Sequence, residues 1–229
     1  MPLPRVLEPE VMDTAQEASD YDAMDHTQVN ARFCDDLAAA HGRRARVLDV
    51  GTGTALIPLE LCRRWPDVQV WAVDLADSML ILARRNVARA GLSARVRVER
   101  RDARSMPWPS ESFDAVVSNS LVHHIPEPGE VLREMWRLVG RGGCLFVRDL
   151  VRPESADRVA DLVATYAPIP EVEPVQRAMH ERQRSLFEAS LRAALTVREA
   201  AGMLAALPAA EGAARVTSDR HWTVSCRKP

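Results

Sequence analysis

A glycine-containing turn follows an apolar run that begins at Val47. The segment from Asp49 to Ala55 reads DVGTGTA and leads into residues with helical spacing. Glycine lets a ligand approach the backbone closely and tolerates a positive φ. In open α/β sheets, ligands bind at the carboxyl ends of the strands. The turn therefore predicts a nucleotide-like ligand beside Gly51 and Gly53.

The residues after the turn indicate which ligands fit poorly. A dinucleotide fingerprint would place glycine or alanine at position 56, which is Leu56 here, so a nicotinamide cofactor is disfavoured. A phosphate-binding P-loop requires a lysine shortly after its last glycine, and none follows Gly53 at a useful distance. These departures leave an adenosine-containing ligand of another kind.

Two further carboxylates follow neighbouring predicted strands. Asp74 ends the second strand, where a carboxylate can accept hydrogen bonds from both hydroxyls of a ribose. Asp102 follows the third strand and offers a second acceptor beside the same crevice. Either carboxylate alone could be an ordinary surface group. Together, at the ends of successive strands, they favour an adenosine site.

The elements that would position these groups alternate between strand and helix from about residue 45. Short β-branched runs predict five strands, at residues 46–50, 68–73, 96–98, 113–118 and 144–147. Between them we expect a helix capped by Thr54, one capped by Asp77 and stopped at Gly91, and one near residues 130–139. Gly140 to Gly143 is expected to turn the chain into the fifth strand.

The flanking segments complete an organisation in four parts within a single domain of residues 1–229. Residues 1–44 predict a helical preface, residues 45–150 a cofactor-binding core, residues 151–195 a helical insertion or lid, and residues 196–229 a helix and a β-hairpin. In the insertion, the stripe containing Met179, Leu186, Phe187 and Leu191 is expected to pack into a core, with lid closure as the alternative.

The amino-acid composition limits the classes of partner that we expect for this chain. The 229 residues include 30 Lys and Arg against 32 Asp and Glu, so no excess of positive charge favours nucleic acid. The four cysteines are widely scattered and predict no metal site. No apolar run resembles a signal peptide or a membrane span, so we expect a cytoplasmic protein without a membrane partner.

On these motifs the chain resembles class I S-adenosylmethionine-dependent methyltransferases over roughly residues 20–150. The segment DVGTGTA is similar to the family's first motif, Asp74 to its ribose acid, and Arg101-Asp102-Ala103 to its adenine-edge motif. The fourth predicted strand, FDAVVSN, resembles a further family motif ending at Asn119. Ala55 stands where the family pattern has a third glycine.

The resemblance implies a three-layer Rossmann-like α/β sandwich whose seven-stranded, mostly parallel sheet has an antiparallel last strand. It implies S-adenosyl-L-methionine as the cofactor, and Tyr21 resembles a tyrosine that reaches the cofactor's methionine carboxylate in related enzymes. The expected cofactor-binding residues are Tyr21, Asp49, Gly51, Thr52, Gly53, Asp74, Leu75, Asp102, Ala103 and Asn119.

The candidate catalytic residues are His123, His124 and Asp149. The two histidines follow the fourth strand beside the expected methyl group, where one could orient or deprotonate an acceptor, although a packing role is the alternative. Asp149 ends the fifth strand near the same mouth. Further candidates for contact with the acceptor are His26, Arg148, Asp219, Arg220, His221 and Trp222.

Related enzymes that methylate exocyclic amines on nucleic acids carry a Pro-Pro-aromatic run after the fourth strand. Ser120, Leu121 and Val122 follow Asn119 here instead, so the resemblance favours a small-molecule acceptor. Three alternatives stay open: a non-catalytic S-adenosylmethionine sensor or subunit, a nicotinamide-dependent oxidoreductase, and a methyltransferase acting on a protein or nucleic acid. The sequence leaves the acceptor, the methylated atom and a homodimer undecided.

Overall fold

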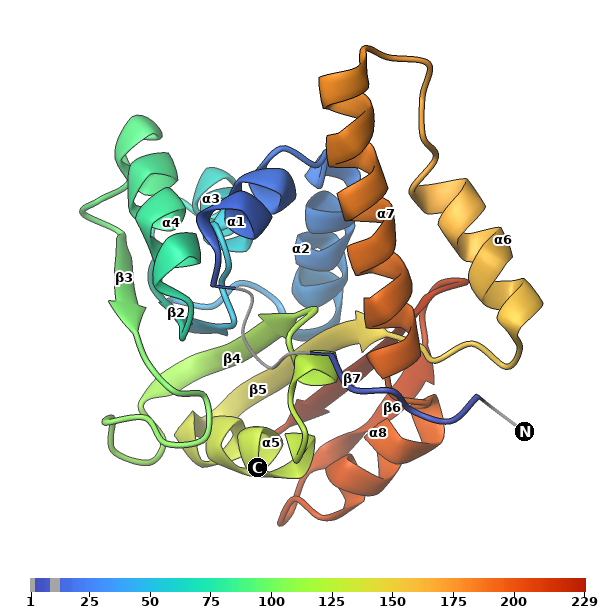
Figure 1. Ribbon diagram of the computed structural model, residues 1–229. Helices are drawn as coiled ribbons and strands as arrows, with labels where there is room; N and C mark the ends of the chain where they lie inside the picture. Colours follow the sequence, from blue (N-terminus) through green and yellow to red (C-terminus); the bar gives the residue numbers. More distant parts are fainter. Residues whose placement is uncertain (1–2, 9–12) are drawn as a thin grey trace.

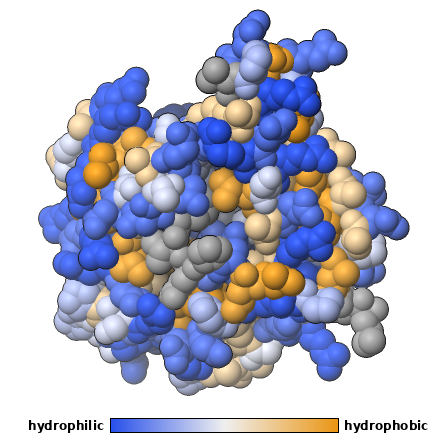
Figure 2. Space-filling view, viewed as in Figure 1, coloured by the Kyte–Doolittle hydropathy of each residue, from blue (hydrophilic) through white to orange (hydrophobic). Residues whose placement is uncertain are grey.

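The computed structural model describes residues 3–8 and 13–229, apart from the side chain of Val175. Residues 1–2 and 9–12, which belong to the predicted helical preface, lie outside the described residues. None of the helices in the described ranges combines the length and apolar character that a membrane span requires. The face of the molecule seen in Figure 2 is mostly hydrophilic, with apolar residues in separate patches.

The described residues form a seven-stranded sheet in the order β3-β2-β1-β4-β5-β7-β6. Neighbouring strands from β3 to β5 are parallel, whereas β7 is antiparallel to both β5 and β6. The predicted Rossmann-like sheet with an antiparallel last strand is therefore confirmed. The strands are β1 (Arg46–Val50), β2 (Gln69–Asp74), β3 (Val96–Arg100), β4 (Phe113–Asn119), β5 (Val139–Leu150), β6 (Glu211–Val216) and β7 (His221–Arg227).

Helices cover both faces of the sheet (Figure 1). One apolar core lies between the sheet and α2 (Thr27–His41), α3 (Leu56–Arg64) and α4 (Asp77–Arg89). The other lies between the sheet and α5 (Pro128–Leu138) and α8 (Val197–Ala205). Phe33 and Leu37 of α2 are fully buried, as the helical spacing of the preface predicts.

Three helices lie outside these two layers: α1 (Ala15–Asp22), α6 (Ala156–Tyr166) and α7 (Pro174–Ala193). The helices α6 and α7 pack against each other around Leu162 and Leu191, and Phe187 joins this cluster. The apolar stripe of the insertion therefore serves core packing at these positions. The short 3-10 helix η1 (Val122–His124) leads from β4 toward α5 and contacts α7.

Several element boundaries differ from the predicted ones. Ala55, not Thr54, is the N-cap of α3, and Ala76, not Asp77, precedes α4. Gly140 to Gly143 does not turn the chain before β5 but already belongs to the strand, where the pairing with β4 shifts register. The predicted hairpin is formed by β6, which begins at Glu211, and β7. These differences are local and leave the order of the elements unchanged.

Candidate active site

The glycine turn after β1 is held by strand β2. The N–H groups of Gly51 and Thr52 both donate to the carbonyl oxygen of Val73 at 2.9 Å. Gly51 and Gly53 have φ values of 73° and 53°, in the left-handed region that favours glycine. Ala55 also has a positive φ, 67°, so the position where the resembled pattern has a third glycine is conformationally demanding.

Asp74 braces the same turn from the end of β2. Its Oδ2 accepts the N–H of Gly53 at 2.8 Å, and its Oδ1 accepts the N–H of Ala76 at 3.0 Å. Burial raises the pKa of Asp74, although these backbone donors favour the ionised form. Each carboxylate oxygen has a second lone pair, so Asp74 can also accept bonds from ligand hydroxyls.

A second acid lies under the turn. Asp49 is buried, and its Oδ2 accepts the hydroxyl of Thr52 at 2.6 Å. Burial raises the pKa of Asp49 to about 7, and the charge of Asp74 adds to that shift. Nearby, Asn119 Oδ1 and Thr54 Oγ1 are buried and have no hydrogen-bond partner among the described residues. Unsatisfied buried polar atoms in a cleft are suited to a polar ligand.

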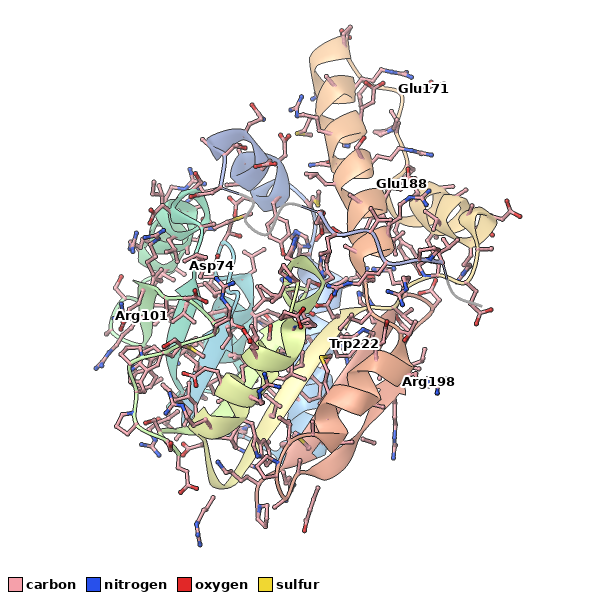
Figure 3. The ribbon with its side chains drawn as sticks, turned by 60° about the horizontal axis from the view of Figure 1, so that its bottom comes forward. Asp74, Arg101, Glu171, Glu188, Arg198 and Trp222 are labelled. Carbon is pink, nitrogen blue, oxygen red and sulfur yellow. The ribbon has the colours of Figure 1, made fainter. Side chains whose placement is uncertain are left out.

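A cleft opens beside these groups, which we call the cofactor cleft. Its walls come from the ends of β1, β2 and β4, the segment after β3, and η1. Figure 3 shows Asp74 and Arg101 near each other, at the ends of β2 and β3. The lining residues used below are Tyr21, Gly51, Gly53, Asp74, Leu75, Asp102, Ala103, Asn119, Leu121, His124 and Ile125.

The cleft continues into a smaller polar hollow beneath the turn. Asp49, Thr52 and Asn119 line this hollow, together with Tyr21 and Asn30. All ten residues predicted to bind the cofactor therefore lie on the cleft or on the hollow. Their assigned roles stay predictions.

Asp102 differs from Asp74 in its surroundings. Its carboxylate is bound by the side chain of Arg104, at 3.0 Å from Nε to Oδ1 and 2.9 Å from Nη2 to Oδ2, and also accepts the Arg104 N–H. These bonds with Arg104 lower the pKa of Asp102, so the carboxylate is ionised at neutral pH. Asp102 remains on the cleft wall.

Tyr21 closes the cleft from helix α1. Burial raises the pKa of Tyr21 to about 12, so its hydroxyl stays a hydrogen-bond donor. The Tyr21 ring lies against His26, with ring centroids 4.6 Å apart, and His26 Nε2 lies 3.1 Å from the Tyr21 carbonyl oxygen. The structure thus ties His26 to the backbone of α1.

Hydrogen bonds from α7 and from α4 hold helix α1 on its two sides. Arg182 of α7 donates to both carboxylate oxygens of Asp20, at 2.7 and 3.2 Å. On the other side, Asn86 of α4 donates to Asp22 at 2.9 Å. The insertion therefore affects the cleft indirectly: α7 holds α1 in place, and α1 carries Tyr21. None of the described residues that line the cofactor cleft belongs to α6 or α7.

The candidate catalytic residues separate into a buried pair and a cleft residue. His123 and Asp149 are buried, with 2.5 Å between Nδ1 and Oδ1, and the His123 N–H donates to Asp149 Oδ2 at 3.1 Å. Burial alone would lower the pKa of His123, but the Asp149 carboxylate raises it above its usual value. His124, by contrast, lines the cleft. The predicted place of Asp149 at the open mouth is corrected: its carboxylate is enclosed.

Glu8 is a site residue that sequence reasoning missed. Its Oε1 lies 3.1 Å from His124 Nδ1 and 3.5 Å from His123 Nε2, and it accepts the hydroxyl of Ser190 at 3.2 Å. Arg5 fixes the same N-terminal segment by donating to the carbonyl oxygens of His123 and Ile125 at 3.1 and 2.9 Å. Residues 3–8 therefore lie against η1, which no local sequence signal indicates.

Two other predicted acceptor contacts lie in structural networks. Arg148 donates to Asp36 of α2 at 2.6 Å and to Thr223 at 3.0 Å, on the opposite side of β5 from Asp149. His221 Nδ1 lies 2.8 Å from the hydroxyl of Ser218 in the terminal hairpin. Because side chains alternate along a strand, Arg148 and Asp149 cannot serve one site. Both networks explain these residues without an acceptor.

Comparison with known proteins places this site in a family context. Residues 47–143 match the family model described as a methyltransferase domain. A demethylmenaquinone methyltransferase from Deinococcus radiodurans is 39% identical over 118 residues, covering 52% of this chain and 48% of the relative. A ubiquinone biosynthesis O-methyltransferase from Xanthomonas oryzae is 36% identical over 141 residues, covering 60% and 54%. The chain thus spans about half the length of these curated relatives.

The fold extends over nearly the whole chain. The crystal structure of a methyltransferase from Aquifex aeolicus, described as dependent on S-adenosylmethionine, superposes with a TM-score of 0.66 at 17% identity. The superposition covers 93% of this chain and 97% of that one. The preface, insertion and terminal hairpin therefore belong to the same architecture as the matched core.

Proposed function

We propose that this chain, whose residues 47–143 match a methyltransferase domain, transfers the methyl group of S-adenosylmethionine to a small-molecule acceptor. The observation that carries this proposal is the glycine turn held by Asp74, beneath which lie polar atoms that find no partner among residues 3–8 and 13–229. This arrangement offers a close backbone approach, a ribose acceptor and polar partners for an amino acid.

The residues that line the cofactor cleft and the polar hollow suit the separate parts of S-adenosylmethionine. Asp74 would accept the ribose hydroxyls, and Leu75 and Ala103 would line the adenine. Asn119 Oδ1 and Thr54 Oγ1, which have no hydrogen-bond partner in the described part of the chain, would receive the ammonium group of the methionine portion together with Asp49. The Tyr21 hydroxyl, which stays protonated, would donate to the methionine carboxylate.

When bound, S-adenosylmethionine supplies a methyl group on a positively charged sulfur, open to in-line displacement. The chain's task is then to align the acceptor and exclude water. Tyr21 and α1 cover the glycine turn, and His124 and Ile125 form the wall leading away from it. His124 remains a candidate to hold or accept an acceptor proton, with Asp149 acting through His123 as a positioning residue.

A small acceptor is favoured because α1 and residues 3–8 cover the approach to the strand ends, and because the net charge is −2. The names of the two curated relatives given above refer to demethylmenaquinone and to ubiquinone biosynthesis, which makes quinone precursors the first acceptors to test. A sensor role and a protein or nucleic-acid acceptor are outcomes of that test. The cytoplasmic location and a homodimer stay predictions.

The cofactor assignment is tested by titration calorimetry. We expect binding of S-adenosylmethionine and S-adenosylhomocysteine and none of nicotinamide dinucleotides. Replacing Asp74 by alanine is expected to weaken binding roughly 5- to 150-fold, because it removes the ribose acceptor and frees the Gly53 N–H. Asp77→Ala, an exposed change on α4, is the matched control. Unchanged affinity in Asp74→Ala would remove this residue from the site.

Transfer itself is tested with isotopically labelled cofactor and quinone precursors, followed by a wider set of metabolites. Label in a small product supports the proposal. Cofactor binding without transfer to any small molecule, protein or nucleic acid would favour the sensor role.

The affinity for S-adenosylmethionine is expected to rise between pH 6 and pH 8. Asp49 has a pKa of about 7 because of burial, and only its ionised form attracts the cationic cofactor. Below pH 7 the affinity should fall by up to about tenfold per pH unit, since binding then releases one proton. Calorimetry in two buffers of different ionisation enthalpy measures this release.

Asp49→Asn is the control for this pH dependence. The variant should bind more weakly at pH 8 and lose most of the change between pH 6 and pH 8. The pKa of Asp49 is raised only in the folded chain, so the unfolded chain loses this proton at a lower pH. The free energy of unfolding should therefore fall from about pH 4 to about pH 7. A pH profile that survives in Asp49→Asn would contradict the assignment.

A further inference from the structure

Three ligand-type side chains meet where the N-terminal segment crosses η1. They are Glu8, His123 and His124, and one ligand atom from each lies within 4.8 Å of the other two. Glu8 Oε1 is 3.5 Å from His123 Nε2 and 3.1 Å from His124 Nδ1. The cluster thus combines two imidazole nitrogens and one carboxylate oxygen, a set that suits divalent transition metals.

The spacing fits tetrahedral coordination. Zinc binds imidazole nitrogen and carboxylate oxygen at about 2.0–2.2 Å, so two ligands of a tetrahedral site lie roughly 3.3–3.6 Å apart. The separations of 3.1 and 3.5 Å from Glu8 Oε1 lie near that range, and the two imidazole nitrogens lie within 4.8 Å of each other. A metal ion can therefore enter between these atoms without rebuilding η1.

Both histidines present suitable lone pairs. Asp149 binds His123 Nδ1 at 2.5 Å, which leaves Nε2 facing Glu8. Metal-binding histidines usually donate their second ring N–H to a carboxylate in this way. His124 Nδ1 is buried and lies 3.1 Å from Glu8 Oε1, which is its only polar contact within residues 3–8 and 13–229. A divalent cation could take the place of the proton shared between this nitrogen and the Glu8 carboxylate.

We propose that Glu8, His123 and His124 bind a divalent transition metal of the zinc class, with Asp149 orienting His123. Three protein ligands leave a fourth position for water or an acceptor oxygen. Because Glu8 belongs to residues 3–8 and both histidines to η1, the ion fastens the N-terminal segment beside the cofactor cleft. This inference does not depend on the proposed methyl transfer.

The test is zinc titration of the full chain after dialysis against a chelator, without S-adenosylmethionine. We expect one zinc ion per chain, with at least about 10- to 100-fold weaker binding in both Glu8→Gln and His124→Gln. Glu171→Gln and His180→Gln, which remove the same residue types away from the cluster, should bind zinc as the unchanged chain does. Circular dichroism checks that each variant is folded.

A second readout reports the geometry. Cobalt(II) in place of zinc should give the visible absorption of a tetrahedral site in the unchanged chain, and this signal should be lost in Glu8→Gln. Equal zinc affinity in all five proteins, or the absence of zinc binding, would overturn the proposal and leave the cluster as a buried ion-pair network. Titration of the same samples with S-adenosylmethionine, and transfer assays with labelled cofactor, report the proposed function separately.

Discussion

Replacing Asp149 by alanine is expected to lower the free energy of unfolding by about 3–5 kcal/mol, the range measured when one partner of a buried ion pair is removed. Asp149 is completely buried and accepts from His123 Nδ1, from the His123 N–H and from the Leu150 N–H. The variant would leave a buried imidazole without its partner. Urea unfolding at pH 7 in the presence of a chelator measures the loss.

A double-mutant cycle separates the pair from general packing. His123→Leu combined with Asp149→Leu should recover part of the stability lost in either single variant, because no unpaired charge remains while the N–H groups of His123 and Leu150 still lack their acceptor. The coupling energy then reports the contact between Nδ1 and Oδ1. A loss below about 1 kcal/mol in Asp149→Ala, the level of an exposed pair, would contradict the burial of this carboxylate.

The sheet was predictable because each core strand shows its burial directly in the sequence. The run from Val47 to Val50 is buried at every position, as a central parallel strand requires. Parallel strands also fix where their ends meet, so Asp49, Asp74 and Asn119 could be placed around one cleft. The hairpin followed from the short separation of the last two strands.

Local backbone geometry was less predictable. Thr54 has the residue type of an N-cap, yet α3 begins after Ala55, whose left-handed conformation is imposed by the packed turn. Likewise, Gly140 to Gly143 has turn composition but lies within β5, where the pairing with β4 passes from Val139 to Cys144 with a register shift. In both places tertiary packing overrides the local preference of the residues, which a single sequence does not report.

The surroundings of the histidines depend on contacts between distant segments. The sequence places His123 and His124 after β4, but their separation into a buried and a cleft-lining residue depends on Asp149 and Glu8. Glu8 reaches them because Arg5 binds carbonyl oxygens of η1 and its flank. A lone arginine and glutamate near the start of the chain carry no pattern that predicts this contact.

Gly51→Ala is expected to destabilise the fold by about 2–5 kcal/mol. The left-handed conformation at φ 73° costs alanine about 1–2 kcal/mol. A Cβ atom at Gly51 would also lie 2.7 Å from the Cβ of Leu121, which is tied to the backbone and cannot rotate away. Forcing extra atoms into packed surroundings costs roughly 1–3 kcal/mol more. Thermal and urea unfolding measure the combined effect.

Gly53→Ala is the matched comparison, because its φ of 53° is also left-handed but its Cβ would meet only the Tyr21 ring edge, at an ordinary 3.6 Å. We expect a stability loss of about 1–2 kcal/mol. The free energy of S-adenosylmethionine binding should weaken by more than the free energy of unfolding, because the added methyl group lies on the cleft wall. Adding Leu121→Ala to Gly51→Ala should recover the packing part of the loss. Equal stability losses in the two glycine variants, unaffected by Leu121→Ala, would show that backbone conformation alone demands glycine at position 51.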